Sequence, residues 1–62
     1  MNEAMTDMIA DVLLEMVPNY KTFEEFLLEA TKFMRLCDEK MRLKDCRMIA
    51  EGVWNDHQAY GV

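Results

Sequence analysis

The sequence predicts an all-α protein in which a short helix and a long helix form an antiparallel hairpin. Apolar residues recur every three or four positions along residues 3–17, and opposite charges recur at the same spacing along residues 23–51. The single proline, Pro18, lies between these two segments. Residues at this spacing share one face of an α-helix, whereas the residue before a proline rarely continues one. Residues 52–62 follow as a tail, and the whole chain makes one small domain.

The first predicted helix, over residues 3–17, carries one broad apolar stripe. Its members follow the three-four spacing of a helix face: Met5, Met8, Ile9, Val12, Leu13 and Met16. Pro18 then ends the segment, and the residues up to the next helix make only a short connector. A connector of this length predicts that the two helices lie side by side and antiparallel.

The second predicted helix begins after Thr22, which forms a capping box with Glu25. In this motif, the hydroxyl and the carboxylate each accept a hydrogen bond from an otherwise unpaired backbone N–H group. No glycine or proline interrupts residues 23–51. Opposite charges one turn apart each add a few tenths of a kcal/mol, and four such pairs are present: Glu29–Lys32, Arg35–Glu39, Asp38–Arg42 and Arg47–Glu51. These features favour one long helix.

Two apolar stripes run along this second segment, on opposite sides of a straight helix. The first stripe matches helix 1, and the second contains Leu36, Leu43, Cys46, Ala50, Val53 and Trp54. A straight helix would span about 45 Å against about 22 Å for helix 1, so its second stripe would stay uncovered. That arrangement predicts a homodimer held together by the second stripe. The alternative is a three-helix bundle with a break near residues 38–44, which brings both stripes to one core.

Composition excludes several classes of function. The net charge of −5 at pH 7 argues against a nucleic-acid-binding protein. No apolar run is long enough to cross a membrane, and no cationic, apolar leader opens the sequence, so we expect a cytoplasmic protein. The chain has no serine, no glycine-rich phosphate loop and no Cys/His/acid cluster at metal spacing. His57 is the single histidine. We therefore expect no cofactor and no enzymatic activity.

Four acidic residues form a ridge along helix 1, with one carboxylate every four positions: Glu3, Asp7, Asp11 and Glu15. Like charges at this spacing oppose helix formation. One interpretation is that the ridge is a solvated face, or that it pairs with Lys32, Arg35 or Arg42 of the neighbouring helix or of a second subunit. The other is that the ridge binds a basic surface. Its carboxylates are about 6 Å apart, close to the spacing of phosphates along a DNA strand.

These observations predict a small acidic, non-catalytic protein interaction module. The ridge leads us to expect a phage or mobile-element regulator that inhibits a host protein by binding its basic, nucleic-acid-binding surface. One alternative is a dimeric nucleic-acid-binding regulator that uses a basic segment, defined as Lys40, Arg42, Lys44 and Arg47. A structural or assembly subunit is the other alternative.

A short stretch near the C-terminus adds a resemblance. The sequence Val-Trp-Asn-Asp at residues 53–56, followed by Gln58 and Tyr60, resembles part of a small acidic nuclease inhibitor of T7-type phages. The resemblance covers only these few positions, so the chain is not assigned to that family on this ground. Trp54 and Tyr60 are also of the residue type that often anchors protein interfaces.

Overall fold

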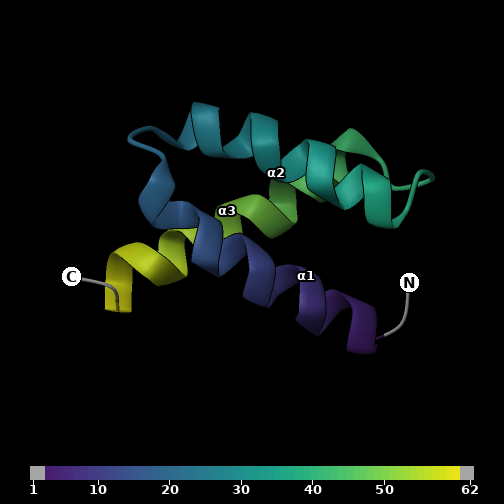
Figure 1. Ribbon diagram of the computed structural model, residues 1–62, viewed down its shortest axis with the longest axis horizontal. Coiled ribbons are helices and arrows are strands. Elements are labelled where there is room, and N and C mark those ends of the chain that lie inside the picture. The colour runs from purple at the N-terminus through teal and green to yellow at the C-terminus, as the bar shows by residue number, and fades with distance from the viewer. Residues whose placement is uncertain (1–2, 61–62) are drawn as a thin grey trace.

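The computed structural model describes residues 3–60, with the side chain of Tyr60 left aside. Within this range the chain forms α1 (Glu3–Met16), a 3₁₀ turn η1 (Val17–Asn19), α2 (Phe23–Cys37) and α3 (Leu43–Tyr60) (Figure 1). The described residues contain no β-strand. The predicted all-helical fold class is therefore confirmed.

The first helix and its connector follow the local sequence closely. α1 buries Ile9 and Leu13 completely, and it ends at Met16, one residue before the expected boundary. Pro18 lies in the first positions of the 3₁₀ turn, where a missing backbone N–H group is tolerated. The turn closes with a hydrogen bond of 3.1 Å from the Tyr20 N–H group to the Val17 carbonyl oxygen. Proline therefore ends α1 and directs the chain into the connector.

Half of the predicted capping box at the start of α2 is present, since no hydrogen bond from the Thr22 N–H group to the Glu25 carboxylate is formed within residues 3–60. Thr22 has extended backbone angles, and its Oγ1 atom accepts a hydrogen bond of 3.2 Å from the Glu25 N–H group. Two acidic residues in the first turn, Glu24 and Glu25, are placed favourably at the positive end of the helix dipole. The capping residues thus set the start of α2 at Phe23, as expected.

The second predicted helix differs from the expectation, because it is interrupted at residues 38–42. Asp38 leaves the helical conformation, and its side-chain Oδ1 accepts a hydrogen bond of 3.1 Å from the Lys40 N–H group. The Met41 N–H group then donates to the Asp38 carbonyl oxygen at 3.0 Å. An aspartate that binds the backbone two residues onward forms a turn in place of a helical one. The interruption falls inside the segment 38–44 that the sequence marks as the alternative break.

The interruption has a physical reason in the packing of the second apolar stripe. Cys46 and Ala50 are fully buried, and Val53 is 8% exposed, all in the same core as the first stripe. A continuous helix over residues 23–51 would measure about 44 Å, longer than the 32 Å maximum extent of the folded chain. The turn therefore lets one core cover both stripes. The expected tail is also helical in part, since α3 continues through the exposed Gly52 to Tyr60.

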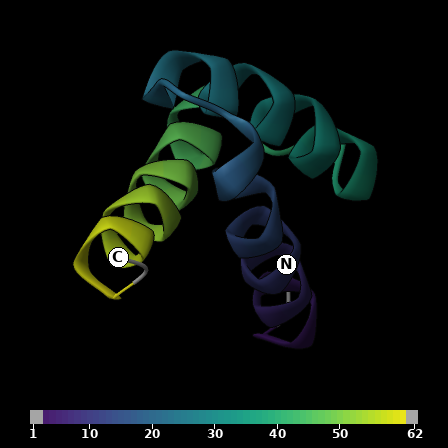
Figure 2. The same ribbon diagram turned by 60° about the vertical axis from the view of Figure 1, so that its left-hand side comes forward.

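The core lies where the three helices meet. Each helix contacts the other two, and α1 and α3 diverge below α2 (Figure 2). Phe26 is the largest fully buried side chain, and its ring lies 5.4 Å from that of Trp54 between centroids. The other buried residues are Ile9, Leu13, Val17, Ala30, Met34, Met41, Cys46, Ala50 and Val53.

Candidate interaction surfaces

The acidic ridge of Glu3, Asp7, Asp11 and Glu15 is exposed along its whole length on α1. Among the described residues there are two ion pairs, Lys32–Glu29 at 3.4 Å and Arg47–Glu51 at 2.9 Å. Neither involves the ridge, so the pairing expected with bases of the neighbouring helix is not formed within residues 3–60. The four carboxylates therefore face solvent in the single chain.

Two apolar side chains lie beside the ridge. Met8 is 46% exposed and Leu14 is 43% exposed, and each is one helical turn from Asp11. The sequence pattern assigns Met8, Ile9 and Leu13 to one buried stripe; Ile9 and Leu13 are buried, whereas Met8 is exposed. The outer face of α1 thus combines four carboxylates with two exposed apolar groups.

The residues predicted to mediate self-association are divided by the fold. Cys46, Ala50 and Val53 are buried by the chain's own helices. Trp54 packs against the Phe23 ring edge to face, with 5.9 Å between centroids. Leu36 and Leu43 remain on the surface, 86% and 62% exposed. The second stripe is therefore mostly core, and two of its leucines are available to a partner.

The basic segment of Lys40, Arg42, Lys44 and Arg47 is exposed on the α2–α3 turn and the start of α3. Arg47 has partners within the chain: its Nε atom donates to Glu51 Oε1 at 2.9 Å, and its guanidinium carbon lies 6.0 Å from the centre of the Phe23 ring. The remaining three bases form no ion pair within residues 3–60.

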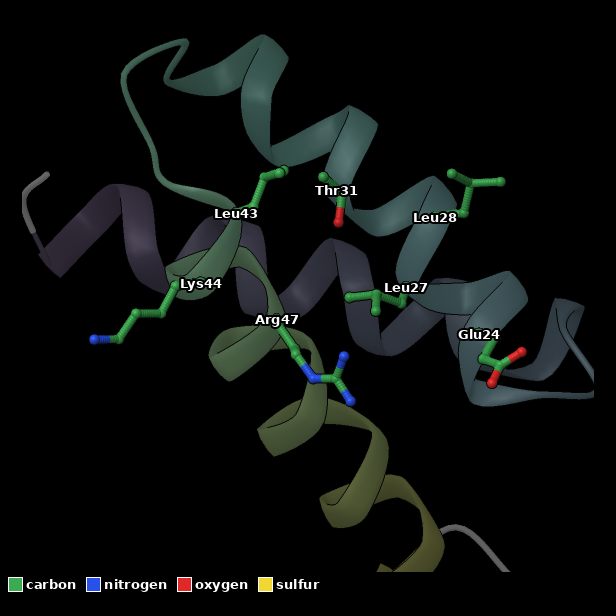
Figure 3. Close-up of a pocket in the computed structure, with 7 residues that line it drawn as sticks. All are labelled: Glu24, Leu27, Leu28, Thr31, Leu43, Lys44 and Arg47. Atoms are coloured by element: carbon green, nitrogen blue, oxygen red, sulfur yellow. The ribbon is translucent and has the colours of Figure 1, made fainter.

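An open groove between α2 and α3 was not predicted from the sequence. It has a volume of about 480 Å³ and takes Glu24, Leu27, Leu28 and Thr31 from α2, with Leu43, Lys44 and Arg47 from α3 (Figure 3). Leu28 is 60% exposed and Leu43 is 62% exposed. In Figure 3, Glu24 and Lys44 lie at opposite ends of the groove, with Leu27 and Arg47 between them. One signal was present in the sequence, because Leu28 belongs to neither apolar stripe.

The cysteines and the single histidine are at least partly buried. Burial raises the pKa of the Cys46 thiol, an effect that the positive charge of Arg35 partly opposes. Cys37 is half-buried, and neither cysteine forms a disulfide. The His57 Nδ1 atom is buried and has no hydrogen-bond partner in the described part of the chain. No cluster of three or more metal-binding side chains occurs within residues 3–60.

None of the described helices combines the length and hydropathy that crossing a lipid bilayer requires. Comparison of the chain with protein-family models, curated proteins and solved structures finds no match.

Proposed function

We propose that this chain is a non-catalytic interaction module that binds a basic surface of another protein through the acidic ridge on α1. The target surface is one that otherwise binds nucleic acid, and occupying it makes the chain a regulator or inhibitor in the cytoplasm, with a phage or mobile element as its source. The observation that carries the proposal is the exposure of all four carboxylates, Glu3, Asp7, Asp11 and Glu15, without an ion pair in the described chain.

The chemistry of the ridge supports this proposal in two ways. Regularly spaced like charges oppose formation of the helix that carries them, and attraction to a cationic partner would offset the repulsion between the carboxylates. A field of one sign also accelerates encounter with an oppositely charged surface. Met8 and Leu14 beside Asp11 offer apolar contacts that exclude water once the partner has docked.

Self-association is part of the same proposal. The folded unit is a compact three-helix protomer, and two protomers form a homodimer. Exposed leucines on α2 and α3 support this, because a chain of this size gains stability by covering apolar surface with a second copy.

The test compares two charge-neutralised variants that have the same net charge as each other. The ridge variant carries Glu3→Gln, Asp7→Asn, Asp11→Asn and Glu15→Gln. The control variant neutralises four other exposed acids, with Glu25→Gln, Glu39→Gln, Asp45→Asn and Asp56→Asn. Each immobilised protein is incubated with a bacterial lysate, and the retained proteins are identified by mass spectrometry.

We expect the wild type and the control variant to retain a nucleic-acid-binding protein that the ridge variant does not retain. Duplex DNA and rising salt should both release that protein, because they compete for its basic surface and screen the contact. Equal loss in the two variants would attribute retention to net charge alone and would refute the ridge as the binding site. If duplex DNA does not displace the retained protein, the claim that the target surface binds nucleic acid is refuted. Circular dichroism confirms that each variant is folded.

A second candidate function is a dimeric nucleic-acid-binding regulator. The observation in its favour is that Lys40, Arg42 and Lys44 are exposed without an ion pair within residues 3–60. Direct binding of the purified protein to duplex DNA, abolished by Lys44→Glu with Arg47→Glu, would favour this function over the first.

A further inference from the structure

The groove between α2 and α3 combines exposed apolar groups with three charged side chains, Glu24, Lys44 and Arg47, of which Arg47 is already paired with Glu51 of its own chain. Its apolar lining consists of Leu27, Leu28 and Leu43, and the side chains of Leu28 and Leu43 are each about 60% exposed. Leu36 is more exposed than either, but it does not line the groove. The groove is therefore the place where exposed leucines of two helices lie together.

We propose that this groove is the contact surface of a twofold-symmetric homodimer. The inference deepens the self-association part of the proposed function and is independent of the acidic ridge. A twofold contact uses the same patch on both subunits, so the patch must be complementary to itself. A patch with charges of one sign fails this requirement, because each charge would face a like charge.

Two of the three charges of the groove, Glu24 and Lys44, meet this requirement, and the third, Arg47, is neutralised by its ion pair with Glu51 of the same chain. Glu24 lies at one end and Lys44 at the other, as Figure 3 shows. A twofold axis that runs across the middle of the groove, in the plane of contact, exchanges the two ends. Glu24 then faces Lys44 of the partner subunit, and the same pair forms a second time by symmetry. Within one chain these two residues form no ion pair.

The leucines follow the same symmetry. In Figure 3, Leu28 lies toward the Glu24 end of the groove and Leu43 toward the Lys44 end, with Thr31 between them. The same rotation places Leu28 against Leu43 of the partner subunit, so the most exposed apolar groups of the groove cover each other.

The size of the chain permits such a contact. A stable dimer buries about 800 Å² on each partner, roughly one sixth of the 4661 Å² of accessible surface. No residue of α1 lines the groove, so the acidic ridge stays accessible in the dimer. One dimer would then present two ridges, and a target with two basic sites would bind it more tightly than one site alone.

The test measures the oligomeric state of the full chain by sedimentation equilibrium, under reducing conditions because both cysteines are free. We expect a dimer for the wild type, and dissociation constants raised about tenfold or more by Leu28→Gln, Leu43→Gln, Glu24→Lys and Lys44→Glu. The matched control is Leu36→Gln, which changes a more exposed leucine outside the groove and should leave the dimer unchanged.

The combined variant Glu24→Lys with Lys44→Glu is the decisive measurement. It restores opposite charges across the proposed interface, so it should dimerise within about threefold of the wild type, whereas each single variant does not. Circular dichroism of every variant separates lost dimerisation from lost folding.

A monomeric wild type at millimolar concentration would overturn the inference, as would a dimer that Leu36→Gln breaks and the groove variants do not. Failure of the charge exchange to restore the dimer would also overturn it. If the wild type is monomeric and retains a lysate protein that Leu28→Gln does not retain, the groove is occupied by a different protein and not by a second copy of this chain. Retention by the ridge is measured separately, so a failed dimer leaves that proposal to its own test.

Discussion

Replacing Phe26 by leucine tests whether the described core holds the three helices together. Phe26 is fully buried. Its ring centroid lies within 6.4 Å of three other aromatic rings, those of Tyr20, Phe23 and Trp54. These rings come from the connector, α2 and α3. Phe26 therefore links segments that are far apart in the sequence.

The expected loss of stability is about 2 kcal/mol. Volume-conserving swaps within a core cost up to about 1.5 kcal/mol, and each favourable aromatic pair contributes about 0.5–1.5 kcal/mol beyond its buried area. The total stability of a chain this short is about 3–9 kcal/mol. Truncation to alanine, which costs about 3–5 kcal/mol, would leave too little folded protein for a precise measurement. A loss of 2 kcal/mol lowers the melting temperature by about 8–16 °C.

Urea unfolding provides the measurement, because the chain has a single tryptophan and its ring is 5.4 Å from that of Phe26. Tryptophan fluorescence and far-ultraviolet circular dichroism should report the same transition, and two protein concentrations separate folding from dimerisation. The control, Leu36→Ala, alters a side chain that is 86% exposed and should change stability by less than about 0.5 kcal/mol. An effect of Phe26→Leu as small as that of the control would refute the described core.

Four further measurements test local features of the fold. Thr22→Ala removes the hydroxyl that caps α2 and should lower the free energy of unfolding by about 1 kcal/mol, measured in urea; an unchanged midpoint would contradict the cap. Asp38→Ala removes the acceptor of the Lys40 N–H group and should cost about 0.5–1 kcal/mol, whereas Asp38→Asn keeps an acceptor and should cost less; equal effects would argue against the turn. N-ethylmaleimide should modify Cys37 before Cys46, as followed by mass spectrometry, because Cys46 is fully buried and burial raises the pKa of its thiol. Because the pKa of the Cys46 thiol is higher in the folded chain, the unfolded chain loses the thiol proton at a lower pH. The free energy of unfolding should therefore fall as the pH rises above about 8.5, and it should fall less in Cys46→Ala; identical pH profiles of the two proteins would contradict this.

The acidic ridge and the groove differ in how far sequence reasoning can reach. The ridge lies on one helix, and a spacing of four residues places Glu3 and Asp7 on the same face whatever surrounds that helix. Its exposure follows from burial of Ile9 and Leu13 on the other face. The groove joins Glu24 of α2 to Lys44 of α3, and their relative position depends on the turn between the helices. No pattern within either helix contains that information.

The sequence was sufficient for the helical class, the cap at Thr22 and the end of α1 near Pro18, because each depends on interactions within a few residues. Continuity of the second helix was a different matter. Residues 38–42 contain no glycine or proline, and local propensity favours a helix there by only fractions of a kcal/mol per residue. Burying Cys46, Ala50 and Val53 in the common core is worth several kcal/mol, and Asp38 satisfies part of the broken backbone. Long-range burial therefore overrode the local preference, and only the packed structure contains that comparison.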